Sequence, residues 1–201
     1  MQGEALIPYI TEPREDTGLT NSKIAIWLFL ASEVMLFGAF FASYIVLRMT
    51  STTWPHGWEL QNVPLGALNT VVLITSSVTM VMAWASLERN DFPRYARFIG
   101  ATVLLGGVFL VIKYFEYSAK FEHHLLPSTS TYLAIYFTMT ALHGLHVIFG
   151  MGVNGYFWMA GRGYWEAGDR QLLINRVENA GLFWHFVDIV WIFLFPIMYL
   201  I

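Results

Sequence analysis

Five long apolar runs divide this 201-residue chain, and no other feature of the sequence restricts its possible folds as strongly. They cover approximately residues 24–47, 66–87, 98–118, 132–158 and 180–201. Each run is long enough to cross the hydrocarbon core of a bilayer, which takes about 20 helical residues. Because only helices and closed barrels satisfy their backbone polar groups in lipid, we predict an all-α integral membrane bundle of five transmembrane helices.

The composition agrees with a membrane-embedded chain. Only 12% of the residues are charged, against about 25% in an average soluble domain. Aromatic residues reach 17% and include eight Trp, a residue enriched at the boundaries between lipid and water. The net charge of -3 gives no sign of a nucleic-acid partner, and the absence of Cys excludes disulfides, thiol nucleophiles and thiolate metal sites.

The domain organisation follows from the same pattern. Residues 1–22 form a polar N-terminal segment, and residues 23–201 form a single transmembrane domain without a repeat or a low-complexity tract. The N-terminus has neither the basic patch and short apolar core of a signal peptide nor the Arg-rich composition of a mitochondrial transit peptide. We therefore expect the first run to be an uncleaved membrane helix.

The distribution of Lys and Arg predicts the orientation of the bundle. Eight of the eleven lie on one side of the membrane, namely Arg14, Lys23, Arg89, Arg94, Arg97, Arg162, Arg170 and Arg176. The other side has only Arg48 and Lys120, and Lys113 lies within the third run. Because cytoplasmic loops carry the excess of Lys and Arg, we predict that the N-terminus is inside and the C-terminus is outside.

Ionisable residues within the runs are the most informative, since each costs about 2.5–3.5 kcal/mol near the bilayer centre. Glu33 lies about nine residues into the first run, close to that centre. Six others form three pairs spaced three residues apart, which places each pair on one face of its helix. The pairs are Lys113 with Glu116, His143 with His146, and His185 with Asp188.

Each of these pairs has a structural interpretation. Lys113 and Glu116 are expected to form an ion pair that snorkels to the interface, and a hydrogen bond to Asp188 would fix the ring of His185. The two His residues of the fourth run would satisfy polar groups on neighbouring helices. Glu33 keeps two open roles, either a proton relay beside a His or a hydrogen bond that holds two helices together. His146 is the first candidate partner and His143 the second.

A metal or haem site is disfavoured by the number of ligands. A di-iron bundle needs several inward carboxylates with Glu-x-x-His pairs, whereas Glu33 is the only central carboxylate. His146 and His185 could in principle hold a haem from two helices, but they stand alone without further His clusters. We therefore expect no cofactor in this chain.

Four segments carry motifs in series: WLFLASEVMLF (27–37), KYFEY (113–117), HGLHV (143–147) and ENAGLFWHFVDIVW (178–191). In order and spacing they resemble subunit III of haem–copper terminal oxidases, from Trp27 to the C-terminus. The second segment departs from the E-Y-x-E motif of that family, because Lys113 stands at its first position. A lone H-G-x-H motif would be weak evidence, but four motifs in series are strong.

The resemblance implies a non-catalytic, non-redox subunit of cytochrome c oxidase in aerobic respiratory electron transport. Such a subunit packs against subunit I, within a complex with subunit II and other subunits, and the partner subunits hold the haem and copper. It stabilises subunit I, supports proton uptake and binds phospholipid. Glu33 corresponds to the membrane carboxylate of the family that reacts with a carbodiimide. The characteristic polar positions correspond to Lys113, Glu116, His143, His146, Glu178, His185 and Asp188.

The length of the chain is a second departure. Longer family members have seven helices and bind lipid in a cleft between the first two and the remaining five. Here either the cleft is missing or helices of another subunit complete it, and the five-helix form favours a prokaryotic plasma (inner) membrane. Three alternatives stay open: an accessory subunit of a quinol oxidase, one of a nitric oxide reductase, or a free-standing proton carrier centred on Glu33. A carrier would be expected to show an internal repeat or broken helices, and the sequence shows neither.

Overall fold

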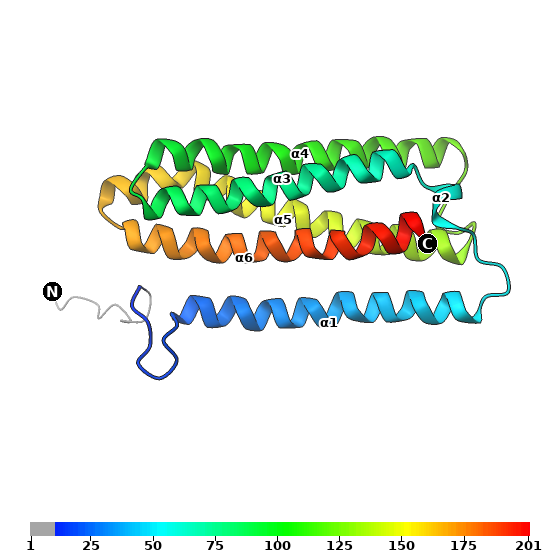
Figure 1. Ribbon diagram of the computed structural model, residues 1–201, viewed down its shortest axis with the longest axis horizontal. Coiled ribbons are helices and arrows are strands. Elements are labelled where there is room, and N and C mark those ends of the chain that lie inside the picture. The colour runs from blue at the N-terminus through cyan, green and yellow to red at the C-terminus, as the bar shows by residue number, and fades with distance from the viewer. Residues whose placement is uncertain (1–10) are drawn as a thin grey trace.

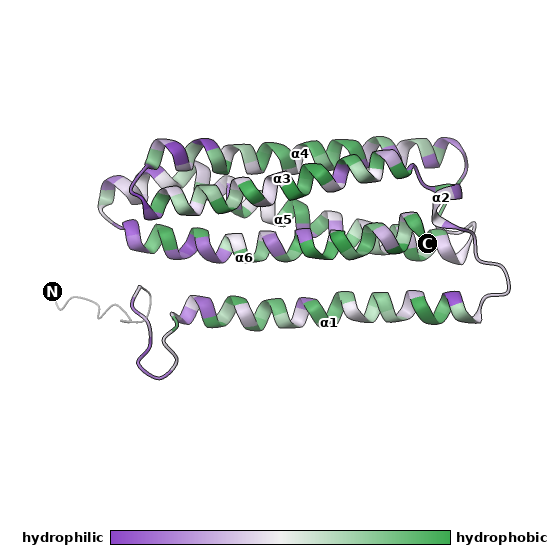
Figure 2. Cartoon of the chain, viewed as in Figure 1, coloured by the Kyte–Doolittle hydropathy of each residue, from purple (hydrophilic) through white to green (hydrophobic). Residues whose placement is uncertain are grey.

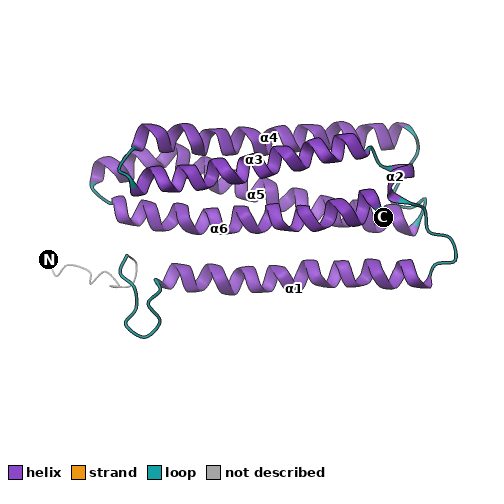
Figure 3. Cartoon of the chain, in the orientation of Figure 1, coloured by secondary structure: helices purple, strands orange, loops and turns teal. Residues whose placement is uncertain are grey.

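A computed structural model describes residues 11–201 of the chain. Its five long helices are α1 (Asn21–Thr50), α3 (Val63–Glu88), α4 (Phe92–Glu122), α5 (Thr131–Ala167) and α6 (Arg170–Phe195). A short helix α2 (Gly57–Leu60) precedes α3, and a π-helical turn η2 (Pro196–Leu200) continues α6. No strand occurs among the described residues (Figure 3). All five long helices are apolar and long enough to cross a membrane, which confirms the predicted all-α bundle.

The boundaries of the helices follow from local sequence signals. The side chains of Thr20, Asn62, Asp91 and Ser130 each accept a hydrogen bond from the backbone N–H three residues later, which satisfies one unpaired donor of the first turn. Helix α5 ends at Ala167 and is capped by Gly168, whose φ of 89° is left-handed and therefore suits a residue without a side chain. Hydrophobic residues follow the lengths of the helices, whereas hydrophilic residues gather toward their ends and in the loops (Figure 2).

The helices form two unequal parts. Helices α3, α4, α5 and α6 form a bundle in which α3 and α5 each pack against both α4 and α6. Helix α1 lies beside this bundle and packs chiefly against α6, with a smaller contact to α5 (Figure 1). The two parts are called the four-helix bundle and the α1 arm below.

The core of the four-helix bundle is built around large aromatic rings. Trp184 and Trp191 of α6 are fully buried. Trp184 fits because glycines face it: a Cβ atom would lie 2.8 Å from its ring at Gly106 and 2.7 Å at Gly150. On the α1 arm, in contrast, only Leu30, Phe37 and Tyr44 are buried. Their seven-residue spacing places them along one face that meets the bundle.

Candidate functional site

Glu33 of the α1 arm is paired with His146 of α5. The carboxyl Oε2 lies 2.9 Å from Nε2 of the ring, and each side chain is only 14% exposed. His146 is the first of the two partners expected from the sequence. The bond joins the α1 arm to the four-helix bundle.

The other ring nitrogen of His146 determines how many protons this pair holds. Its Nδ1 lies 2.8 Å from the carbonyl oxygen of Leu142, and a carbonyl only accepts, so Nδ1 must carry a hydrogen. The second nitrogen then either accepts a hydrogen from a protonated Glu33 or carries a hydrogen and donates it to the carboxylate. In both arrangements the bond contains one proton and the pair has no net charge. The pair is therefore compatible with the apolar surroundings, and it can also exchange its proton.

Lys113 and Glu116 form a closed network with two tyrosines. Nζ of Lys113 donates to Glu116 Oε2 (3.1 Å) and to the hydroxyls of Tyr136 (3.1 Å) and Tyr199 (2.8 Å). Both hydroxyls donate in turn to Glu116 Oε1, over 2.7 Å and 2.6 Å. These four side chains come from α4, α5 and η2 and are called the Lys113 network. Every donor in it is used, and its two formal charges cancel.

The Lys113 network corrects one expectation from the sequence. The ion pair between Lys113 and Glu116 is present, but these side chains do not snorkel to the interface, because they are only 9% and 3% exposed. The physical reason is that the tyrosines supply acceptors inside the bundle. A lysine with three inward acceptors has no need to reach water.

His185 is fixed by a different neighbour from the one expected. Its Nδ1 lies 2.7 Å from the hydroxyl of Ser77 on α3, so the predicted bond from His185 to Asp188 is wrong. Asp188 is buried beside the same Ser77, although neither of its carboxyl oxygens meets the geometry of a hydrogen bond within residues 11–201. In the contact between Ser77 and His185 either partner can be the donor, depending on which ring nitrogen carries the hydrogen.

His143 also departs from its expected role. Its fully buried ring packs between Phe109 and Trp191, with centroid distances of 5.6 Å and 5.2 Å. In the described part of the chain neither ring nitrogen has a hydrogen-bond partner. The expectation that both histidines satisfy polar groups on neighbouring helices therefore holds for His146 and is wrong for His143. The three-residue spacing from His146 placed both rings on one face of the helix, but it could not show which ring would meet a partner.

Two further bonds attach the α1 arm at its ends. Near the N-terminal end Lys23 donates to Glu178 of α6 over 2.6 Å, and near the C-terminal end the Tyr44 hydroxyl donates to the Ile197 carbonyl over 3.1 Å. Together with Glu33, these residues are spaced about three helical turns apart on the arm. The sequence motifs singled out Glu178 but not its partner Lys23. No motif in the sequence pointed to Tyr44, which shares only the seven-residue spacing of the buried α1 residues Leu30 and Phe37.

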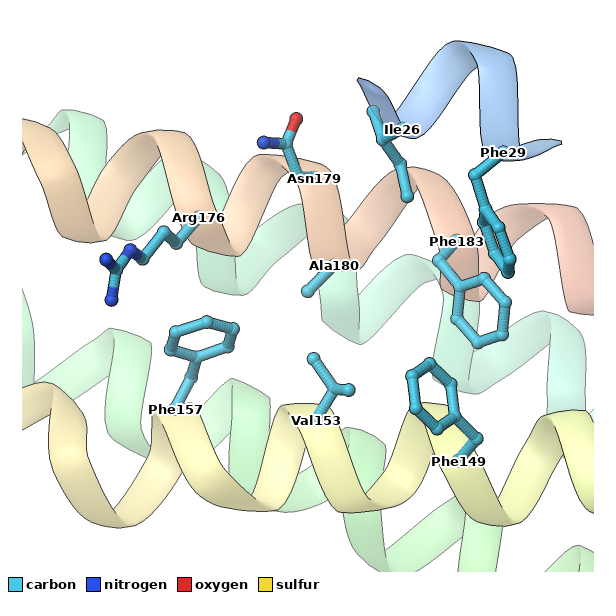
Figure 4. A pocket seen from close by; sticks show the side chains of 9 residues that line it. All are labelled: Ile26, Phe29, Phe149, Val153, Phe157, Arg176, Asn179, Ala180 and Phe183. Carbon is cyan, nitrogen blue, oxygen red and sulfur yellow. The ribbon is translucent and has the colours of Figure 1, made fainter. Parts of the chain in front are cut away.

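A cavity of about 480 Å³ lies between the α1 arm, α5 and α6. Figure 4 shows phenylalanine rings from all three helices gathered toward one end, and Arg176 toward the other. Phe183 stands between Phe29 and Phe149, with centroid distances of 5.9 Å and 5.4 Å. The cavity is therefore apolar along most of its length, with polar groups near one end. Its lining residues are Ile26, Phe29, Phe149, Val153, Phe157, Arg176, Asn179, Ala180 and Phe183.

The described residues do not provide a fitting set of metal or haem ligands. Within residues 11–201 no group of three or more His, Asp or Glu side chains could hold a metal ion. The haem pair considered from the sequence also fails on its chemistry, because both ring nitrogens of His146 are engaged by Glu33 and Leu142. The paired polar groups instead link helices, as Glu33 does with His146 and Glu116 with Tyr136 and Tyr199.

Comparisons with known proteins agree on one family. The family model described as cytochrome c oxidase subunit III matches residues 15–201. Cytochrome c oxidase subunit 3 of Bacillus sp. (strain PS3) is 33% identical over 182 residues, which cover 90% of this chain and 86% of the relative. Cytochrome bo(3) ubiquinol oxidase subunit 3 of Pseudomonas aeruginosa is 33% identical over 187 residues, covering 90% and 85%. A haem–copper oxidase subunit I+III of Aeropyrum pernix is 30% identical over 185 residues, covering 89% and 22%.

Proposed function

The chain belongs to the cytochrome c oxidase subunit III family, and we propose that it is the non-redox subunit III of a proton-pumping haem–copper terminal oxidase. In this role it packs against subunit I, in a complex with subunit II and further subunits that hold the haem and copper. The relative named as subunit I+III supports subunit I as the direct partner, since one protein there carries both names.

The observation that carries this proposal is how the intramembrane polar groups are used. Glu33 with His146, and the Lys113 network through its two tyrosines, form assemblies without net charge that connect different helices. Groups arranged in this way stabilise a scaffold and hold protons, but they do not present ligands to a redox centre. The chain therefore supports the stability and proton uptake of subunit I rather than the reduction of oxygen.

Removal of the chain tests this role. The remaining catalytic core should reduce oxygen at its normal initial rate and then lose activity progressively during turnover. Initial rates and their decay are measured with an oxygen electrode on complexes purified with and without the chain. If the first turnovers were abolished, the chain would take part in the chemistry itself.

The isolated chain should also be colourless, whereas the complex absorbs as a haem protein.

The cavity between the α1 arm, α5 and α6 supports the binding of a phospholipid. An acyl chain would lie among Phe29, Phe149 and Phe183, and Arg176 stands at the end where a phosphate would bind. Arg176 donates to the Tyr164 hydroxyl over 2.7 Å, and its guanidinium has further N–H groups for a phosphate. Native mass spectrometry of the complex should show less retained lipid for Arg176→Gln, and unchanged lipid for the exposed control Arg162→Gln.

The proposed location is the plasma membrane of a prokaryote, with the N-terminus in the cytoplasm. Its support is the charge asymmetry of the loops and the bacterial relatives. A reporter that is active only in the cytoplasm should be inactive when it is fused after Ile201. Activity there would reverse the orientation.

The main alternative is subunit III of a quinol oxidase. The relative from Pseudomonas aeruginosa is named as a ubiquinol oxidase subunit and is as similar as the cytochrome c oxidase relative from Bacillus. The electron donor is set by the partner subunits, so it is tested on the intact complex. Oxidation of reduced cytochrome c in preference to quinol supports the first proposal, and the reverse preference supports the alternative.

A further inference from the structure

Each helix of the four-helix bundle contributes one buried side chain to the region around Trp191: Asn69 of α3, next to Thr70, Lys113 of α4, His143 of α5 and Trp191 of α6 itself. Trp191 defines this region. Its Nε1 donates over 3.0 Å to Thr70, the neighbour of Asn69. Its ring centroid lies 5.2 Å from the His143 ring and 5.3 Å from the Lys113 ammonium. These four side chains are called the Trp191 layer.

Two members of the Trp191 layer, Asn69 and His143, have no partner. Both are fully buried. Neither the amide oxygen and nitrogen of Asn69 nor the two ring nitrogens of His143 make a hydrogen bond to any residue in 11–201. Buried polar groups are almost always paired with protein or water. His143 packs against the ring of Trp191, and Asn69 is the chain neighbour of the residue that Trp191 bonds, so each of these buried side chains requires a partner.

The polar neighbours of the layer cannot supply that partner, because they are already engaged. Lys113 directs its three N–H groups to Glu116, Tyr136 and Tyr199. The two tyrosine hydroxyls each donate their single hydrogen to Glu116, and Trp191 has used its only N–H. No donor of these neighbours is left for the two unpartnered side chains.

The charge balance indicates the chemical class of the missing partner. The positive charge of Lys113 is matched by Glu116 over 3.1 Å, so the layer needs no counter-ion. A neutral imidazole and a carboxamide each present both a donor and an acceptor, and water is a small molecule that offers both functions. We propose that the Trp191 layer binds internal water and that a shared water molecule connects Asn69 with His143.

This water links two helices that the protein itself joins only weakly. Helices α3 and α5 each pack against α4 and α6, so they face each other across the bundle. A water between Asn69 and His143 would connect these two opposite helices through hydrogen bonds. It is a binding site within the bundle, separate from the lipid cavity and from the pair of Glu33 with His146.

A double-mutant cycle on the purified oxidase complex tests the proposal. Asn69→Leu and His143→Phe remove the polar atoms while keeping much of the shape of each side chain. If water is bound, each variant lowers the midpoint of thermal unfolding, because the water loses a partner. The double variant lowers it by less than the sum, because both substitutions act on the same water. If no water is bound, each substitution removes an unpaired polar group and the midpoint rises.

Asn154 of α5 provides the matched control. Its amide is equally buried and unpartnered within the described residues, but it lies eleven residues from His143, about 16 Å along the helix. The effects of Asn154→Leu and Asn69→Leu on the unfolding midpoint should therefore be additive.

Additivity of Asn69→Leu with His143→Phe, or a rise in either midpoint, overturns the proposal. A cryo-EM map that resolves other internal waters but none between these two side chains overturns it as well. If His143→Phe does not assemble, His143→Gln takes its place in the cycle, and the map remains decisive.

Discussion

The α1 arm and the four-helix bundle use different physical means to stay together in the same membrane. In an 18-residue apolar stretch of α1 only 11% of the residues are buried, compared with 28% in α4, 33% in α3 and 50% in α5 and in α6. The bundle is held by rings such as Trp184, which lies against two glycines. The arm is attached by three polar bonds, at Lys23, Glu33 and Tyr44.

This difference shows how polar groups are used when lipid surrounds every helix. Apolar side chains gain little by leaving lipid for another helix, so helices associate through close packing and interhelical hydrogen bonds. The bundle has the close packing, and it encloses the Lys113 network. The arm lacks extensive packing and depends on individual bonds. Substitutions in the bundle should therefore affect folding as a whole, whereas substitutions on the arm should change only its attachment.

The largest effect is expected at Lys113. Lys113→Met leaves the buried carboxylate of Glu116 without its cation, and breaking a buried ion pair costs about 3–5 kcal/mol. Thermal unfolding of the purified complex, together with the yield of assembled subunit, measures the loss. Adding Glu116→Gln in the same chain should recover much of it, because no uncompensated charge then remains. A double variant as unstable as Lys113→Met alone would show that charge is not the cause.

The next effect is expected at Gly150. The Cβ atom of Gly150→Ala would lie 2.7 Å from the ring of Trp184, and overpacking of this kind typically costs about 1–3 kcal/mol. Gly152→Ala is the control, since nothing lies within 4 Å of its Cβ position on the same helix. The two variants are compared by their unfolding midpoints in the complex. Equal midpoints would mean that the bundle is not held by the packing of Trp184.

The third effect is expected at Glu33, in the middle of the α1 arm. Glu33→Gln should be mild, because its amide can donate to the unprotonated nitrogen of His146. Glu33→Ala should weaken the attachment by about 1–3 kcal/mol, since it leaves a buried nitrogen unpaired. Retention of the chain in the complex during detergent washes measures the attachment of the arm.

The same variants separate the two roles left open for Glu33. A proton relay predicts that Glu33→Gln assembles normally yet slows steady-state oxygen consumption, because an amide cannot take up and release the proton of the pair. A structural role predicts normal rates across the pH range. Normal rates of the Gln variant at alkaline pH would eliminate the relay.

The sequence predicted the parts of this molecule that depend on local pattern. The apolar runs determine the five helices, and the depth of Glu33 pointed to His146, because both residues lie near mid-membrane. The burial of Lys113 was not predictable in this way. Its acceptors Tyr136 and Tyr199 lie 23 and 86 residues away in the chain, and neither tyrosine differs locally from an interfacial one.

The polar partners on α3 were missed for a related reason. Ser77 fixes His185 and Thr70 accepts the bond from Trp191, but hydroxyls in a membrane helix usually bond to their own backbone. Thr70 also donates to the Gly66 carbonyl. A sequence shows that such a hydroxyl is present, but the register between two helices decides which ring it meets.

The smallest effect is expected at the N-terminal end of the arm, where Lys23 and Glu178 are still 28% and 30% exposed. Partly exposed ion pairs contribute about 0–1 kcal/mol, so Lys23→Gln should weaken the attachment of the arm less than Glu33→Ala does. Salt screens the charges that water can reach, so the difference between Lys23→Gln and the unaltered chain should shrink as ionic strength rises. Arg162→Gln is the matched control, because Arg162 pairs with Glu166 within α5 and does not touch the arm. Retention of the chain at low and high salt compares the three proteins. A large loss at Lys23 that persists at high salt would mean that the arm is anchored chiefly at its N-terminal end. The contrast between a point-attached arm and a packed bundle would then need a different physical basis.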